Sequence, residues 1–191
     1  MRDCAVLTAI GVRREDGKRM ILGVSAALSE AEPHWRSFLM SLKERGMGIP
    51  DSVTSDAHEG LKAALRAAFN ASPWQRCQCH LQQNAQAYVP KIQMRESVAA
   101  DIRTLFNADS MALAEERLRV LIQKYAKSAP RLSDWMEQAI PEGLTIFSLP
   151  EHKRKRLRTS NTSSILRLVT AILMEISEDW ETGKAYLNIK K

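Results

Sequence analysis

The sequence predicts an α/β fold whose strands all lie in the first part of the chain. The first 80 residues alternate short apolar runs with amphipathic segments, in the order strand, strand, helix, strand, helix, strand. From about residue 82 the apolar residues recur only at helical spacing, with short connections, as in a small helical bundle. We therefore expect an α/β part over residues 1–80 and an all-helical segment from 82 to about 140.

Two strands joined by a tight turn are expected at the start of the chain. Residues 4–12 are apolar on both faces of an extended run, a pattern typical of a central strand that is buried on both sides. Asp16 and Gly17 form one of the strongest short signals for a hairpin turn. A second strand is therefore expected over residues 18–26.

A helix and a third strand follow the predicted hairpin. Ser29 and Glu32 have the spacing of a capping box, which predicts a helix start, and Gly46 is expected to end that helix. A short strand over residues 51–55 then leads into an amphipathic helix over residues 57–69.

Asp56 stands at the junction between that strand and that helix, and it has two interpretations. Asp56 and Glu59 have capping-box spacing, and on local signals alone a helix cap is the commoner role. An Asp at the carboxyl end of a buried strand also faces the crevice where open α/β sheets place ligands. Asp56 is therefore also a candidate metal ligand, and the two roles are compatible.

Cys77, Cys79 and His80 look like half of a zinc site. They belong to a run that begins at Trp74 and that predicts a strand leading into a helix. Structural zinc needs four ligands, usually as two separated pairs, and no second pair stands at a suitable spacing. A buried or locally hydrogen-bonded structural role is therefore favoured over zinc binding.

The helical segment predicts three helices, and a basic cluster follows it. Apolar residues at helical spacing mark helices within residues 98–106, 111–125 and 132–140, and a loop or short extended piece is expected over 141–150. A last helix is expected over residues 163–181.

The basic cluster consists of Lys153, Arg154, Lys155, Arg156 and Arg158. Two interpretations are equally favoured: the cluster is an exposed helix start that faces solvent, or it contacts DNA phosphates. Phosphate contacts would position DNA without specifying its sequence.

Composition narrows the class of protein. The chain has 191 residues and a formal charge of +6, which favours a polyanionic partner. Three cysteines are too few for a disulfide framework, and there is no signal peptide, so a cytoplasmic protein is expected. The longest apolar run, 165–174, contains Arg167 and is too short to span a membrane. The absence of a Gly-rich phosphate loop leaves kinase or ATPase chemistry without support.

Two motifs stand out for their residues and their separation. The first is S-D-A-H-E-G-L at residues 55–61, and the second is W-Q-R-C-x-x-H at residues 74–80. Further stretches that belong with them are 3–12, 19–23, Asn84, 89–91, 158–161, 166–169 and Met174-Glu175. Together these stretches resemble the Mutator-type transposases of bacterial insertion sequences, and the resemblance covers nearly the whole chain.

The resemblance implies an RNase H-like core with an Asp-Asp-Glu triad. In such a core the triad binds two divalent ions, Mg²⁺ or Mn²⁺, which activate water or a DNA 3′-hydroxyl for attack on a phosphodiester. Asp56 matches the second Asp, and His58, Cys77 and His80 are expected near the active site. The resemblance makes residues 1–80 a partial, incomplete RNase H-like core, 81–157 a helical insertion, and 158–191 a remnant of the region with the catalytic helix.

The departures from the family pattern predict an inactive chain. The family's first Asp lies on a strand before the hairpin, and this chain begins after that strand. Ser164 stands where the resemblance places the catalytic Glu, and Glu175 and Glu178 lie beyond an internal deletion. One carboxylate cannot hold two divalent ions against their hydration, and the electrostatic stabilisation of the transition state is lost with the other ligands.

The resemblance also implies the partners. DNA is expected to be bound at the terminal inverted repeats of the element, with the protein itself or a full-length transposase as a further partner, and a nucleoid-associated location follows. The alternative is a non-catalytic fragment that binds DNA or a transposase and regulates the intact enzyme. A third possibility is a decayed reading frame without function.

Overall fold

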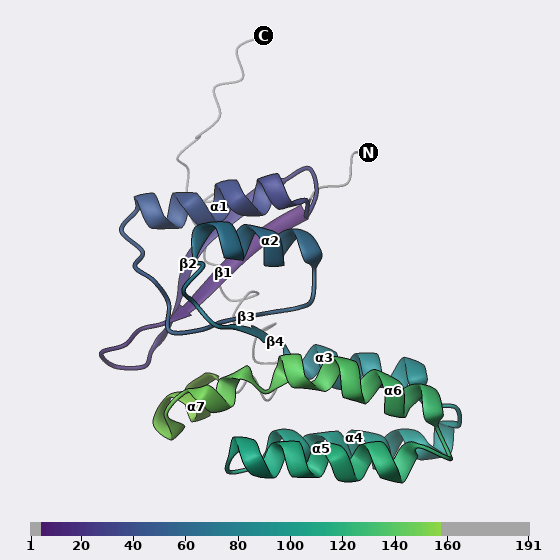
Figure 1. The fold of residues 1–191 in the computed structure, drawn as a ribbon. Helices are drawn as coiled ribbons and strands as arrows, with labels where there is room; N and C mark the ends of the chain where they lie inside the picture. The colour runs from purple at the N-terminus through teal and green to yellow at the C-terminus, as the bar shows by residue number, and fades with distance from the viewer. Residues whose placement is uncertain (1–4, 158–191) are drawn as a thin grey trace, which may run out of the picture. The chain divides into compact units, whose positions relative to one another are not determined.

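The computed structural model describes residues 5–157 (Figure 1). The α/β part contains β1 (Ala5–Val12), β2 (Arg19–Ala27), α1 (Glu32–Glu44), β3 (Val53–Ser55), α2 (Glu59–Ala68) and β4 (Trp74–Arg76). The helical part contains α3 (Gln78–Ala85), η1 (Gln86–Tyr88), η2 (Ile92–Met94), α4 (Arg95–Phe106), α5 (Met111–Tyr125), α6 (Pro130–Ala139), η3 (Ile140–Gly143), η4 (Thr145–Ser148) and α7 (Glu151–Leu157), where η marks a 3-10 helix. The predicted α/β class and the order of its elements are confirmed.

Strands β1 and β2 form the predicted antiparallel hairpin. The turn is closed by the Arg13 amide, which donates to the Lys18 carbonyl at 2.9 Å, and by Gly17, whose φ of 70° favours glycine. The Asp16 carboxylate accepts from the Lys18 amide at 3.0 Å. The register runs from Ala5 opposite Ala27 to Val12 opposite Arg19, with an irregularity between Ala9 and Ile10.

Among residues 5–157, helices cover one face of this hairpin and leave the other uncovered. Leu7 is 1% exposed and packs with α1 and α2, whereas the neighbouring Val6, on the other face of β1, is 65% exposed. The prediction that residues 4–12 are buried on both faces is therefore wrong for the part of the chain that the structure describes. An apolar sequence indicates that both faces can be buried, but it does not supply the covering elements.

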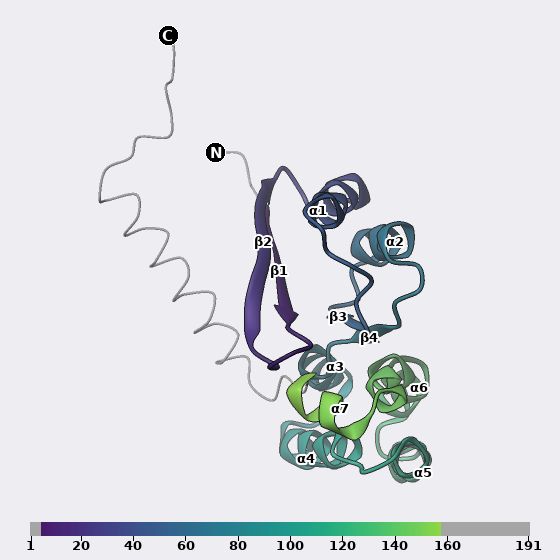
Figure 2. The same ribbon diagram turned by 90° about the vertical axis from the view of Figure 1, so that its left-hand side faces the viewer.

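Helices α1 and α2 lie side by side on that covered face (Figure 2). Gly46 ends the α1 region as predicted, with a φ of 92° and its amide donating to the Lys43 carbonyl. The predicted capping box is wrong, because Ala31 occupies the N-cap and no side chain caps the helix. Ser29 instead accepts from the Ala31 amide at 3.3 Å, and Glu32 pairs with Arg36 at 2.6 Å.

Strands β3 and β4 form a second sheet that is separate from the hairpin. They are parallel, with Val53 opposite Trp74 and Ser55 opposite Arg76. Among the described strands each sheet has two members, and none pairs with both β1 and β3. Val53 and Trp74 nevertheless pack against the same apolar cluster as Leu7, so both sheets share the layer formed by α1 and α2.

The helical part has its own apolar core. Its fully buried side chains include Leu81 of α3, Ile102 and Leu105 of α4, Leu132 and Met136 of α6. The three helices predicted within residues 98–140 are confirmed as α4, α5 and α6. Residues 140–148 form the 3-10 helices η3 and η4, where a loop or extended piece was expected, so that expectation is wrong.

Some predicted features lie outside the described residues. These are Cys4, Arg158, Ser164 and the helix expected over 163–181. Within residues 5–157, no helix is long and apolar enough to cross a membrane.

Gly60 is required by the close approach of α2 to the segment before α1. A Cβ atom at this position would lie 2.9 Å from both the Glu30 carbonyl oxygen and the Glu32 amide nitrogen, which are backbone atoms that cannot rotate away. We expect Gly60→Ala to lower the free energy of unfolding by about 1–3 kcal/mol in urea titrations. Gly48→Ala is the control, since a Cβ there meets nothing within 4 Å. Equal stability of the two variants would contradict this assignment.

Candidate functional site

The carboxyl ends of β3 and β4 bring the two sequence motifs together. Because the strands are parallel, both end at the same edge, where Asp56 follows β3 and Cys77 follows β4. The Cys77 amide donates to the Ser55 carbonyl at 2.6 Å and so extends the pairing by one bond. The Trp74 indole N–H donates to the Ser55 hydroxyl, which in turn donates to the Asp56 carbonyl.

Asp56 is exposed, and its carboxylate makes no hydrogen bond or ion pair with any described residue. The capping interpretation is wrong: α2 begins at Glu59, its N-cap is His58, and no side chain caps it. Glu59 does not reach back but lies 3.3 Å from the Lys62 ammonium. The helix starts two residues later than a cap at Asp56 requires, which leaves this carboxylate directed to solvent.

His58 lies near Asp56 in sequence but is engaged with the segment before α1. Its Nε2 is 3.9 Å from a Glu30 carboxylate oxygen, and its buried Nδ1 has no hydrogen-bond partner among the described atoms. The nearest glycine, Gly60, would place a Cβ 3.1 Å from the imidazole ring. The imidazole therefore sits in the crowded contact between the starts of α1 and α2.

Cys77 and His80 do not assemble a metal site in the described residues. Cys77 is buried, which fits the structural role favoured for it, and His80 is exposed. Within residues 5–157 no group of three His, Cys, Asp or Glu side chains is placed to hold a metal ion. The described residues thus fit neither a zinc centre nor a two-metal centre at Asp56.

Gln75, a residue of the second motif whose role was not predicted, is the polar centre of the region. Its side chain is only 2% exposed, and its amide nitrogen donates to the Gly143 carbonyl at 2.6 Å and to the Arg76 carbonyl at 2.9 Å. Its amide oxygen accepts from the Ile146 amide at 2.7 Å. Gln75 therefore joins β4 to the turns η3 and η4, about 70 residues later in the chain. Its position between an aromatic and a cationic residue gives no local signal of that role.

Glu142 adds an ionic contact beside Gln75. Its two carboxylate oxygens accept from the Lys62 ammonium at 3.2 Å and from the Arg76 guanidinium at 3.1 Å. The side chains of Lys62 and Arg76 are 14% and 15% exposed, and the ammonium also lies 4.5 Å from the centre of the Trp74 ring. These largely buried cations hold the end of the helical part against α2 and β4.

The basic cluster is partly engaged within the protein. Lys153 pairs with Asp51 at 2.7 Å, and Arg14 binds the other oxygen of the same carboxylate at 2.7 Å. Arg154 donates to the Asp109 carbonyl and stacks over Phe147. The side chains of Lys155 and Arg156, together with Arg158, lie outside the described residues.

Comparison with known proteins identifies the family. The family model described as "Transposase, Mutator family" matches residues 1–163, which is most of the chain. This chain belongs to the Mutator family of transposases. The family assigned from the two motifs is thereby confirmed.

Several relatives within the Mutator family are transposases of named insertion sequences. The chain is 44% identical over 207 residues to the transposase for insertion sequence element IS406 of Burkholderia multivorans, covering 97% of this chain and 53% of that protein. It is 32% identical to the transposase for ISRM5 of Rhizobium meliloti, covering 97% and 51%. It is also 32% identical to the transposase for IS256 in transposon Tn4001 of Staphylococcus aureus, covering 96% and 52%. The chain thus spans about half the length of these curated relatives.

Replacing Gln75 should loosen the contact between β4 and the 3-10 turns of this Mutator family chain. In Gln75→Leu the buried Ile146 amide loses its acceptor, whereas the Gly143 carbonyl keeps a bond from Gln78 at 2.8 Å. We expect a loss of about 1–3 kcal/mol in the free energy of unfolding, because a buried amide is left without a partner. Hydrogen exchange at Ile146 should accelerate.

Gln83→Leu is the matched control for this change, because Gln83 lies exposed on α3. It should change stability by less than about 0.5 kcal/mol. A Gln75→Leu variant as stable as the control, with unchanged exchange at Ile146, would contradict the proposed contact.

Asp51 should make stability depend on pH in the acid range. The hydrogen bonds from Lys153 and Arg14 hold the pKa of the Asp51 carboxyl below its ordinary value. The ionised form is thus favoured by folding, so its contribution is present above the unfolded-state pKa of about 3.9 and is lost as the pH falls through the lower folded-state pKa. Asp51→Asn should remove this contribution.

The measurement is the urea midpoint of the wild type and of Asp51→Asn between pH 7 and pH 2. The gap between the two proteins should be largest above about pH 4 and should close below it. Asp134→Asn, at an exposed position of α6, controls for the loss of one negative charge. A gap that is constant with pH would refute the assignment to ionised Asp51.

Proposed function

We propose that this chain is part of a transposase that cleaves and joins DNA at the ends of an insertion sequence, and that Asp56 supplies one of its metal-ligating carboxylates. The observation that carries the proposal is the placement of Asp56. It is an exposed carboxylate without a partner among the described residues, at the carboxyl end of a parallel strand. Open α/β sheets place ligands at that edge.

We further propose that this polypeptide does not cleave DNA by itself. Two-metal phosphoryl transfer needs several oxygen ligands converging on the ions. Among residues 5–157 Asp56 belongs to no group of three His, Cys, Asp or Glu side chains that could hold a metal ion, and Ser164 stands where the family resemblance places a Glu. The described residues do not fit a pair of divalent ions.

The two separate sheets support an incomplete RNase H-like core. We infer that β1–β2 and β3–β4 are two portions of one sheet that lacks a strand between β1 and β3. Both pairs pack on the layer formed by α1 and α2, and β1 and β3 each have one edge without a strand partner among the described residues. A single added strand would pair with both edges and produce a continuous mixed sheet.

The same open edges favour one alternative function. A fragment whose β1 and β3 edges have no partner among the described strands is suited to bind an intact transposase by strand addition and thereby to regulate it. DNA remains the expected partner in either case, and the formal charge of +6 is consistent with it. Because Lys153 and Arg154 already have internal partners, phosphate binding at the cluster would have to replace the Asp51 contact or use the later basic residues.

A nicking assay tests the proposed function. The purified chain is incubated with supercoiled plasmid that carries the terminal inverted repeats of its own element, in Mg²⁺ or Mn²⁺. We expect no nicking by this chain alone, since the metal ligands are incomplete. Nicking that is abolished by Asp56→Ala would disprove the proposed inactivity, although it would support Asp56 as a ligand.

A mixing experiment separates the two functions. The intact IS406-type transposase is assayed with increasing amounts of this chain. Inhibition together with co-purification would favour the regulatory alternative. The absence of both inhibition and co-purification would exclude it. Asp56→Ala in this chain serves as the control, because regulation by strand addition does not need its carboxylate.

A further inference from the structure

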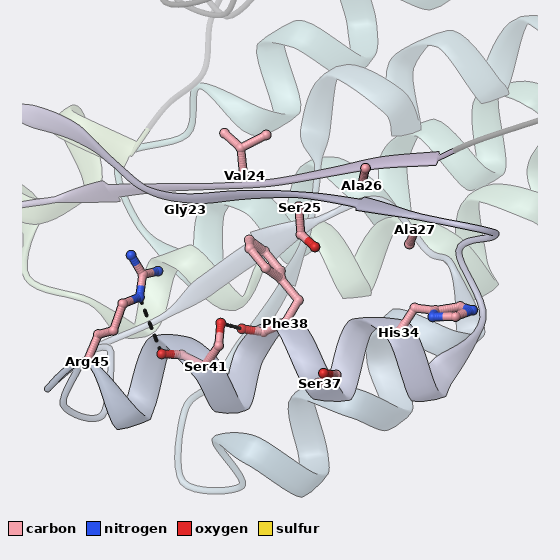
Figure 3. Close-up of a pocket in the computed structure, with 10 residues that line it drawn as sticks. All are labelled: Gly23, Val24, Ser25, Ala26, Ala27, His34, Ser37, Phe38, Ser41 and Arg45. Carbon is pink, nitrogen blue, oxygen red and sulfur yellow. Dashed lines mark hydrogen bonds between the residues drawn. The ribbon is translucent and has the colours of Figure 1, made fainter. Parts of the chain in front are cut away.

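A hollow lies between β2 and α1 (Figure 3). Its volume is about 390 Å³, and it lies open to solvent along part of its length. We call it the β2–α1 groove. Its lining residues are Gly23, Val24, Ser25, Ala26 and Ala27 from β2 with His34, Ser37, Phe38, Ser41 and Arg45 from α1.

The groove exists because the inward positions of β2 carry small side chains. Ser25 lies opposite buried Leu7, so Gly23, Ser25 and Ala27 share the face that points to α1, while Val24 points away from it (Figure 3). A strand packed on a helix ordinarily fills these positions with larger apolar side chains. Here Phe38 of α1 is the one large apolar side chain in the lining that is buried, so the space above it is left open.

The walls of the groove carry polar groups whose bonding capacity is unused. The hydroxyls of Ser25 and Ser37 and the imidazole of His34 make no hydrogen bond with the part of the chain that the structure describes. Strand β2 pairs with β1 and with no other described strand, so the outward amides and carbonyls between Gly23 and Ala27 also lack a strand partner. A second strand laid along this edge would satisfy them.

Arg45 gives the groove a charged end. Its guanidinium donates to the Leu22 carbonyl at 2.6 Å and to the Ser41 carbonyl at 3.3 Å, and it forms no ion pair with any described carboxylate. These two bonds fix the cation beside Gly23, where Figure 3 shows it directed toward β2, and leave N–H groups for a further acceptor. A carboxylate is the acceptor that a guanidinium binds most strongly.

We propose that the β2–α1 groove binds an extended peptide segment that pairs with the free edge of β2 and places a carboxylate against Arg45. Five residues of β2 span about 17 Å, which accommodates a partner strand of four or five residues. Alternate side chains of that peptide enter the hollow above Phe38. A peptide that pairs with β2 and ends there brings its C-terminal carboxylate to Arg45. The partner is therefore a protein whose chain ends in a short apolar extended segment. The proposal does not rest on the DNA-related function.

The test uses the full chain and a library of five-residue peptides with Ala, Val, Thr or Leu at each position. One set ends in a free carboxylate and the other is amidated. Binding is followed by fluorescence anisotropy, and the site by hydrogen exchange at the Gly23–Ala27 amides. We expect free-acid peptides with apolar side chains to bind and to protect those amides, and we expect amidated peptides to bind at least tenfold more weakly.

Two variants test the two parts of the site. Ser25→Ile fills the hollow without adding a charge and should abolish binding while leaving the protein folded, because isoleucine suits a strand. Arg45→Gln should weaken the free-acid peptides at least tenfold and leave the amidated ones unchanged. Val6→Thr is the control, because Val6 is 65% exposed on the opposite face of the hairpin and is not among the lining residues of the groove.

The outcomes decide the proposal. Binding that is lost in Ser25→Ile, reduced in Arg45→Gln and retained in Val6→Thr supports it. If no peptide in the library protects the β2 amides, or if Ser25→Ile binds as the wild type does, the groove is not a peptide site. Equal affinity for free-acid and amidated peptides would overturn the role assigned to Arg45.

Discussion

The arrangement of the α/β part depends on one constraint: two short sheets share a single layer of helices. Leu7 from the hairpin and Val53 and Trp74 from the parallel pair all pack into the cluster supplied by α1 and α2. Two-stranded sheets are marginal alone, because each has too little apolar surface to bury. The common helical layer therefore holds β3 in place, and with it the residue that follows, although no backbone bond links the two sheets among the described strands.

This constraint explains why Asp56 is exposed. A carboxylate that capped α2 would be occupied by backbone amides, and its availability to a ligand would be reduced. Because α2 starts at Glu59, the loop 56–58 is free to carry the carboxylate past the strand end. The other motif residues have structural roles. Gly60 permits close packing of α2 against the segment before α1, the Trp74 indole donates to Ser55, and Gln75 accepts from the Ile146 amide of η4. A motif that marks a family can thus consist mostly of residues that hold one chemical group in position.

Local sequence patterns predicted the helices and strands but not the contacts between residues that are distant in sequence. The Asp16-Gly17 turn located the hairpin, Gly46 located the end of α1, and apolar periodicity located α2 and the three helices of the bundle, because those signals are local. The capping-box pattern misplaced both helix starts, since a Ser or Asp followed by Glu three residues later is compatible with a cap but does not require one. The roles of Gln75 and Glu142 could not be inferred, because their partners are distant in sequence. Gln75 binds Gly143, 68 positions away, and Glu142 binds Lys62 and Arg76, which are 80 and 66 positions away. The groove beside β2 was likewise missed, although its cause is visible in the run Gly-Val-Ser-Ala-Ala.

The distance along the chain between Gln75 and its partners has a consequence for biosynthesis. A nascent chain releases β4 from the ribosome well before Gly143 and Ile146 have been translated. Until those residues emerge, the glutamine amide must remain hydrated, and β4 cannot settle into its final burial. The buried environment of β4, the strand paired with β3, is therefore complete only once the helical part is present. The final form of the candidate site thus depends on residues that are translated about 70 positions after it.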